Sequence, residues 1–430
     1  MRLKAQTLPL FSELVNLDKR LPTNTLSQQN RIQRWANFIA GYSIEFTEKC
    51  LSKRDNNKDI VIDPFLGCGT TLVACRNLGF YGVGFEQHKL FYMLSKAKLT
   101  NYTIEELEFV KNIIQNEKQE INWSNDALKF ITKMFSNKDI TPIRCASFAI
   151  GQIEDKLKPL AIALFLKTCE ASCGAQTDGI YKAPTSRKKS IPFNQALESS
   201  LRIFKEDILS TWYSKHWVSQ PKAECYLKSS ENMKELNDSS VGVCITSPPY
   251  LNNFDYAEMT RLHLYLLGWA NSWKDISETV RNKLITNTTT ALKNKKSNEY
   301  QNAHRNNLPD EIIAELAPIV FVLSKERKIR AGKKDYDFLV YPYYSQINSV
   351  LAELFRILKP GGCIHWVVAD AALYGVHIKT HLHTGLLMRN LGFKDVEVQF
   401  LRHRGHRWIL NKRDGSKEGL GEYHIIARKG

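Results

Sequence analysis

The feature that most constrains the fold is a strand, a glycine-rich turn, a helix and a second strand within about 30 residues. The apolar segment DIVID, residues 59–63, leads directly into the turn DPFLGCGTT, residues 63–71. We expect a helix from about Thr70 to Leu78 and a second strand, YGVGFE, at residues 81–86. Strands joined in this way pair in parallel through a right-handed crossover. The front of the chain is therefore predicted to be an α/β fold.

The composition of the chain narrows its class. Hydrophobic residues make up 43% of the 430 residues, which is enough to bury a large core. No run of about 18 apolar residues and no apolar region of a signal peptide occurs, so we expect a cytoplasmic protein that makes no membrane contact. The nine cysteines form no CxxC pair, which argues against a cysteine-built zinc site. The net charge of +16 favours a polyanionic partner.

Helical patterns dominate the first half of the chain. Residues 31–50 carry Ile32, Trp35, Phe38, Ile39 and Tyr42 at helical spacing, which predicts one helix there. A capping box at Thr103 and Glu106 predicts the start of another helix. Further helices are expected at residues 126–136, 153–169 and 194–212, with a polar, basic loop at 177–190.

Strand patterns resume in the second half. They lie at residues 223–228, 241–245, 361–370, 396–401 and 423–428, and the last two could form a closing antiparallel pair. A polar segment rich in Asn, Thr and Lys separates them at residues 271–340. We accordingly divide the chain into five parts. Residues 1–100 hold the N-terminal helices and the cofactor-binding part of the core, and residues 101–222 form a mainly helical insertion. The core resumes at residues 223–270, is interrupted by a basic polar insertion at 271–340, and ends with residues 341–430.

The glycine turn carries residue types that bind a ligand through the backbone. Gly67 and Gly69 permit a tight turn and the close approach of a ligand, and Thr70 and Thr71 open a helix whose dipole favours an anion. Glu86 ends the next strand, where an acid can accept hydrogen bonds from ribose hydroxyls. No Lys follows the turn, which disfavours a nucleoside-triphosphatase loop. The pattern predicts a binding site for a nucleoside with an anionic tail. The plainer alternative is that the two glycines only form a turn and that Glu86 only caps a strand.

A second turn, TSPPY at residues 246–250, follows the buried strand pattern VGVCI. In an open parallel sheet both turns should face one crevice beyond the carboxyl ends of the strands. The two prolines hold the carbonyl groups of Ser247 and Pro248 rigidly as acceptors for an amino group. Tyr250 offers a planar face on which a base could stack. A turn with a core tyrosine is the alternative, and this motif alone leaves both open.

The two turns and the helix end RILKPGG, residues 356–362, together resemble the S-adenosylmethionine-dependent DNA amino-methyltransferases, which modify cytosine N4 or adenine N6. The resemblance covers roughly residues 30–100, 223–270 and 340–430. It implies a Rossmann-like methyltransferase fold, with a mostly parallel seven-stranded sheet, a closing antiparallel strand and a helical insertion. The implied cofactor residues are Asp63, Pro64, Phe65, Gly67, Gly69, Thr70, Thr71 and Glu86. The implied catalytic residues are Ser247, Pro248, Pro249 and Tyr250.

The resemblance also implies a reaction. A serine before Pro-Pro is the form usual for N4-cytosine enzymes, whereas Asp or Asn is typical of N6-adenine enzymes. We therefore expect S-adenosylmethionine as cofactor, no metal, and methylation of a flipped cytosine in double-stranded DNA. The enzyme would be the modification part of a restriction system whose endonuclease acts separately. The alternatives are an N6-adenine enzyme, an RNA base methyltransferase and a non-catalytic nucleic-acid-binding protein.

Two departures from the family pattern concern the cofactor's adenine and the spacing of the motifs. An acid usually follows the third strand, but Ser230 stands at that position. The insertion at residues 101–222 also separates the two turns more widely than usual.

Basic residues in the insertions and near the C-terminus are candidates for DNA contact, and residues 101–222 could form a DNA-recognition subdomain. Each basic segment could equally be a solvated surface. The candidates are Lys182, Arg187, Lys188, Lys189, Lys295, Lys296, Arg402 and Arg404.

Overall fold

The computed structural model describes residues 30–430 apart from 37–40, 56–57, 179–180, 213–216, 218–222, 253–254, 289–294, 330–333 and 405–419. The βαβ unit expected at the front of the chain is present. It consists of β1 (Ile60–Asp63), α4 (Thr70–Leu78) and β2 (Tyr81–Phe85). The two strands pair in parallel, with Ile60 opposite Tyr81. This unit places the glycine turn at the carboxyl end of β1.

One seven-stranded sheet organises the molecule, in the order β10-β11-β7-β6-β1-β2-β5. The remaining strands of this sheet are β5 (Glu224–Tyr226), β6 (Val241–Thr246), β7 (Leu358–Ala369), β10 (Phe393–His403) and β11 (Gly421–Lys429). Neighbouring strands from β5 to β7 pair in parallel, and β11 is antiparallel to both β7 and β10. The Rossmann-like fold with a closing antiparallel strand is therefore confirmed.

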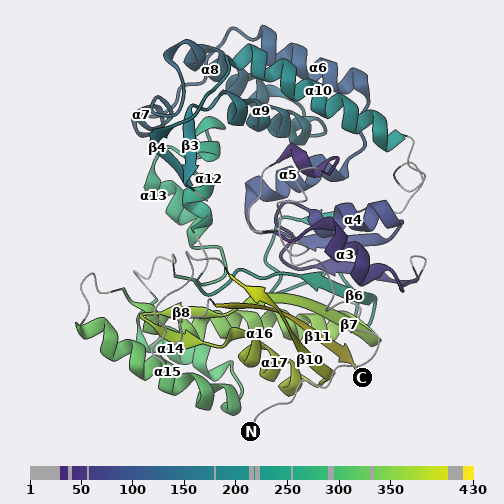
Figure 1. Cartoon of the computed structure of the whole chain (residues 1–430), viewed down its shortest axis with the longest axis vertical. Helices are drawn as coiled ribbons and strands as arrows, with labels where there is room; N and C mark the ends of the chain where they lie inside the picture. The colour runs from purple at the N-terminus through teal and green to yellow at the C-terminus, as the bar shows by residue number, and fades with distance from the viewer. Residues whose placement is uncertain are drawn as a thin grey trace.

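Helices cover both faces of the sheet, as a parallel sheet requires. On one face Val61 and Val243 join a core with residues of α3 (Ile44–Leu51), α4 and α5 (Lys89–Leu99). On the other face Ile62 and Cys244 pack with α16 (Val340–Ile357) and α17 (Thr380–Asn390). Figure 1 shows α3 and α4 on one side of the strands and α16 and α17 on the other. Strand β6 is buried along its whole length, so the segment after it leaves the sheet from the centre of the molecule.

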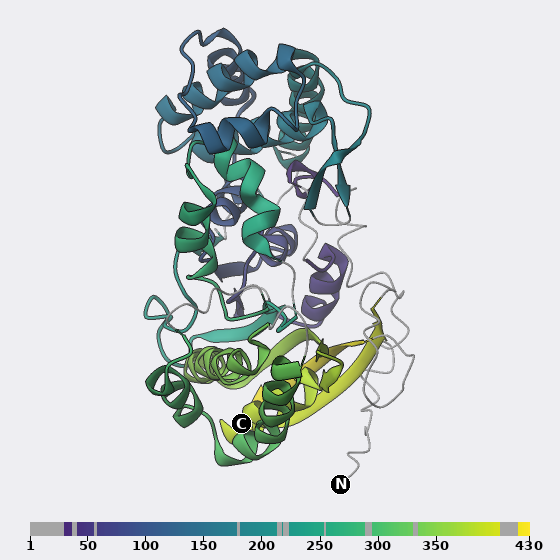
Figure 2. The same cartoon turned by 90° about the vertical axis from the view of Figure 1, so that its left-hand side faces the viewer.

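A block of helices fills much of residues 101–212. Its helices are α6 (Ile104–Asn116), α7 (Asn125–Ile131), α8 (Asn137–Gln152), α9 (Lys158–Ser172) and α10 (Phe193–Trp212). Figures 1 and 2 show this block at the end of the molecule away from β10 and β11. The capping box at Thr103 and Glu106 is confirmed at the start of α6. A separate role for the block in DNA recognition stays a proposal.

Two local expectations are wrong. The segment 177–190 is mostly an antiparallel hairpin of β3 (Ala175–Asp178) and β4 (Tyr181–Arg187), because the backbones of the two strands pair residue by residue although the basic composition is that of a loop. Residues 31–50 do not form one helix. They contain η1 (Gln33–Trp35) and α3, because Ala36 is extended with a φ of −139° and Ser43 caps a new helix by accepting from the N–H of Phe46. Phe38 and Ile39 lie outside the described residues.

The polar segment at 271–340 is largely helical where it is described. The other elements of the second half are α12 (Tyr256–Leu266), α13 (Trp273–Ile276), η2 (Ser277–Arg281), α14 (Asn298–Asn306), α15 (Asp310–Ile329), η3 (Tyr336–Phe338), β8 (Ala371–Leu373) and β9 (Val376–Ile378). In the described part of the chain, no helix is both long enough and apolar enough to span a membrane.

Candidate active site

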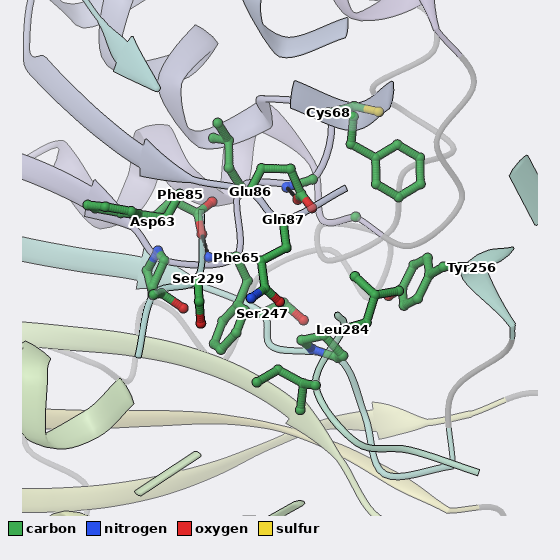
Figure 3. Close-up of a pocket in the computed structure, with 18 of the residues that line it drawn as sticks. Asp63, Phe65, Cys68, Phe85, Glu86, Gln87, Ser229, Ser247, Tyr256 and Leu284 are labelled. Atoms are coloured by element: carbon green, nitrogen blue, oxygen red, sulfur yellow. Dashed lines mark hydrogen bonds between the residues drawn. The ribbon is translucent and has the colours of Figure 1, made fainter. Parts of the chain in front are cut away.

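The glycine turn and the Pro-Pro turn line one pocket beyond the carboxyl ends of β1, β2 and β6, as expected (Figure 3). The pocket encloses about 780 Å³ of space, counting its open mouth. Its lining residues include Asp63, Pro64, Phe65, Gly67, Thr70, Glu86, Ser247 and Pro249 from the two predicted motifs. Of the predicted site residues, Gly69, Thr71, Pro248 and Tyr250 are not part of this lining.

Asp63 anchors the start of the glycine turn. Its side chain is buried and accepts hydrogen bonds from the backbone N–H of Phe65 at 3.0 Å and from the hydroxyl of Thr246 at 2.6 Å. The hydroxyl of Thr71 donates to the same carboxylate. Burial raises the pKa of the Asp63 carboxyl, and the hydrogen bonds from Thr246 and Thr71 oppose that rise. The acid therefore joins β1, α4 and β6 at the floor of the pocket.

The glycines shape the turn in the way the sequence suggested. Gly67 and Gly69 have φ values of 55° and 86°, which other residues rarely adopt. The carbonyl of Gly67 accepts from the hydroxyl of Ser95 at 2.9 Å, and a Cβ at Gly69 would lie 3.1 Å from that hydroxyl oxygen. Gly69 also caps α4, so the positive end of the helix dipole lies beside Thr70 in the pocket. An anionic group would be stabilised there.

Glu86 lies in the same pocket and holds the turn from the other side. One carboxylate oxygen accepts from the N–H of Gly67 at 2.8 Å, and the other accepts from the N–H of His88 at 2.7 Å. Each carboxylate oxygen can accept a further hydrogen bond, so both can still receive ligand hydroxyls. Burial raises the pKa of Glu86 to about 7, and the two backbone donors oppose that rise. A carboxylate in this position suits a diol ligand.

The Pro-Pro turn presents Ser247 to the pocket, while Tyr250 lies behind it. The Ser247 hydroxyl donates to the phenol oxygen of Tyr250 at 3.3 Å. The phenol donates in turn to Glu422 at 2.9 Å, and the guanidinium of Arg404 lies 5.2 Å from the centre of the Tyr250 ring. Burial first, and then the nearby Glu422 carboxylate, raise the pKa of Tyr250 well above its usual value. Tyr250 is therefore a neutral hydrogen-bonding group in this site.

Several lining residues were not predicted from the sequence. They are Gly41, Tyr42, Leu66, Cys68, Phe85, Gln87, Phe91, Lys228, Ser229, Tyr256, Leu284 and Ile285. Ser230 also lines the pocket, so the residue that replaces the family's usual acid does face the ligand space. The sequence offered a hint of Tyr42 as a site residue, since it is an aromatic residue next to a glycine and a helix cap. Nothing in the sequence pointed to Leu284 and Ile285 as pocket residues, because they come from the polar segment at 271–340.

The predicted DNA-binding residues differ in their surroundings. The ammonium of Lys182 lies 2.6 Å from Glu170, and that of Lys188 lies 3.5 Å from the same carboxylate. Arg187 donates to the carbonyl of Lys133 at 3.0 Å, and Lys189 is exposed.

The remaining candidates lie at two other places. Lys295 is half-buried and Lys296 pairs with Asp335. Arg402 pairs with Glu422 at 2.7 Å, and Arg404 contacts Tyr250. The rest of the basic stretch, from residue 405 onward, lies outside the described residues.

A buried cluster of Cys50, His365 and His424 lies outside the pocket lining, and its possible ligand atoms are within 4.8 Å of one another. The Nδ1 atom of His365 lies 3.1 Å from Nε2 of His424, a hydrogen-bond distance. Burial lowers the pKa of His424 to about 3 and that of His365 well below its usual value, so both rings are neutral. A hydrogen bond between two neutral rings accounts for their contact. That the chain needs no metal stays a prediction.

Comparison with known proteins agrees with this geometry. A family model described as DNA methylase, of the N6 and N4 type, matches residues 16–97. The type II methyltransferase M.BsoBI of Geobacillus stearothermophilus is 21% identical, over 99% of this chain and 90% of its own. M.AvaI of Nostoc sp. is 20% identical, over 91% of this chain and 86% of its own, and M.MvaI of Kocuria varians is 23% identical, over 92% and 87%. The chain is thus similar to the DNA amino-methyltransferases, the family whose members methylate cytosine N4 or adenine N6.

Proposed function

We propose that this protein transfers a methyl group from S-adenosylmethionine to the N4 amine of a flipped cytosine at a specific site in double-stranded DNA. The observation that carries the proposal is that Ser247 lines the same pocket as Asp63 and Glu86. A nucleoside held at Glu86 and an amine held at Ser247 would thus meet in one space. The serine before the two prolines favours cytosine over adenine.

The pocket suits S-adenosylmethionine in three respects. Glu86 keeps acceptor capacity for the ribose hydroxyls, and the N-terminus of α4 beside Thr70 favours the carboxylate of the methionine end. Phe65 and Phe85 contribute apolar surface to the same pocket. When bound, the cofactor would supply a methyl group on a positively charged sulfur. Ser230, in place of an acid, would face its adenine.

The residues of the Pro-Pro turn would position the amine. The Ser247 hydroxyl oxygen and the Pro248 carbonyl would accept the two N–H groups, which aims the nitrogen lone pair at the methyl carbon. The nitrogen would take the methyl group from the cofactor's sulfur, and the proton that it loses would leave through its acceptor at Ser247 to solvent. Tyr250 would support the base by stacking. Arg404 now lies over that ring, so it would have to move aside if the base stacks on the same face.

The test is mass spectrometry of nucleosides from DNA of cells that express the protein. We expect N4-methylcytosine and no N6-methyladenine. Detection of N6-methyladenine alone would show that adenine is the target on the same fold. The double variant Ser247→Ala with Tyr250→Ala should lose methylation while it retains most of its affinity for DNA. Full activity of that variant would contradict the proposed catalytic turn.

We also propose that the protein is the modification part of a restriction system, since M.BsoBI, M.AvaI and M.MvaI, which match most of the chain, are named type II methyltransferases. The cognate endonuclease would be a separate protein. Methylome sequencing should reveal one short recognition sequence methylated at nearly every occurrence. Scattered methylation without a common sequence would contradict a restriction role.

A further inference from the structure

Three hydrogen bonds link the catalytic turn to the C-terminal strands of the sheet. The Ser247 hydroxyl donates to Tyr250, and Tyr250 donates to one oxygen of Glu422. The other oxygen of Glu422 accepts from Nε of Arg402 at 2.7 Å. Glu422 is the second residue of β11 and is only 6% exposed, so bulk water competes little for its carboxylate. These four side chains form a continuous chain that ends in an ion pair.

The chemistry of Glu422 fixes the direction of every hydrogen bond in this chain. An ionised carboxylate can only accept, so the Tyr250 proton must point toward it. The phenol oxygen is then free to accept, and it takes the single proton of Ser247. The lone pairs of the Ser247 oxygen consequently stay available on the side of the pocket. Arg402 pairs with the carboxylate in its buried position, as a buried charge needs a partner.

We propose that Glu422 is a positioning residue that makes the Ser247 hydroxyl an acceptor for the amine of the target base. This role rests on the proposed function of Ser247. It gives Arg402 a role beside the active site in addition to, or in place of, contact with DNA. No sequence motif predicts it, since Glu422 lies 172 residues from Tyr250.

The substitution Glu422→Gln tests the direction of the chain with little change of shape. Arg402 can only donate, so it should take the oxygen of the new amide and leave the amide NH₂ facing Tyr250. Tyr250 would then accept instead of donate, and its own proton would turn to Ser247. The Ser247 proton would point at the amine. We expect the single-turnover rate to fall about tenfold or more, with little change in the affinity for DNA or S-adenosylmethionine.

A double-mutant cycle with Tyr250→Phe separates positioning from a merely structural role. The phenylalanine keeps the ring but removes the hydroxyl that links Ser247 to Glu422. Adding Glu422→Gln to this variant should therefore slow the reaction little further. Asp337→Asn is a matched control, because Asp337 is a buried acid that pairs with Arg327 at 2.9 Å and does not line the pocket. It should lower thermal stability and leave the single-turnover rate unchanged.

Multiplicative losses in the double variant would overturn the proposal, and so would an unchanged rate in Glu422→Gln. These results are distinct from failure of the proposed function. If the wild-type protein methylates adenine, the same cycle can be measured on adenine and still decides the role of Glu422. If Ser247→Ala keeps full activity, the catalytic turn itself is wrong.

Discussion

The hydroxyl of Tyr42 lies 3.1 Å from a carboxylate oxygen of Asp63, at the floor of the pocket. The same hydroxyl contacts the hydroxyl of Thr71 at 2.5 Å and the carbonyl oxygen of Ile245 at 3.1 Å. Tyr42 thereby joins the segment before α3 to β1, α4 and β6. One side chain holds together the elements that form the glycine turn and the Pro-Pro turn.

Replacing Tyr42 by Phe should lower the free energy of unfolding by about 1–3 kcal/mol, because the buried Asp63 carboxylate loses a polar partner. Denaturant unfolding measures this loss. Tyr265→Phe is a suitable control, since Tyr265 is fully buried and its hydroxyl has no hydrogen-bond partner in the described structure. That control should be nearly neutral. Equal losses in the two variants would mean that the Tyr42 hydroxyl adds nothing specific.

The affinity for S-adenosylmethionine should depend on pH through Glu86. Its pKa is raised from 4.5 to about 7 in the folded protein, because burial disfavours the charged form. The protonated Glu86 therefore contributes to the stability of the folded protein below about pH 4.5, and this contribution is lost as the pH rises through about 7. The ribose hydroxyls need the ionised carboxylate, so cofactor binding should tighten as the pH rises through about 7. Calorimetric titrations from about pH 6 to pH 8.5 test this, and Glu86→Gln should bind weakly with a flat profile.

Gly69→Ala should weaken cofactor binding and destabilise the fold. The φ of 86° costs an alanine about 1–2 kcal/mol, and the new Cβ would press on Ser95. Gly361→Ala separates these effects, because Gly361 has a φ of 74° but no atom within 4 Å of the added Cβ. We expect the control to lose stability only, with unchanged cofactor affinity. Normal cofactor affinity in Gly69→Ala would argue against a close approach of the ligand to this turn.

The two lysines Lys182 and Lys189 should respond differently in DNA binding. The Lys182 side chain is 12% exposed and paired with Glu170, whereas Lys189 is exposed. If Lys189 contacts a phosphate, Lys189→Gln should lower the slope of log affinity against log salt by about 0.9. Lys182→Gln should leave that slope unchanged and reduce stability instead. Filter-binding titrations at several salt concentrations distinguish the two, and an equal change in slope would contradict this assignment.

Local sequence predicted the parts of the site that local geometry determines. The spacing of DPFLGCGTT fixes a strand, a turn with positive φ and a helix start, whatever the rest of the chain does. The strand before TSPPY was predicted for the same reason, since an apolar run followed by two prolines must end there. The prediction of one helix at 31–50 failed because helical spacing does not reveal the extended Ala36 or the cap at Ser43.

The sequence by itself determined the two turns, the resemblance to the DNA amino-methyltransferases and the order of the motifs along the chain. Only the tertiary structure decided which distant residues complete the site. Tyr42 reaches Asp63 and Ile245, and Glu422 reaches Tyr250, because the strand order places β11 beside β7 and β6 beside β1. Hydrogen bonds between residues so far apart depend on how the sheet is assembled, and no spacing in the sequence encodes that assembly.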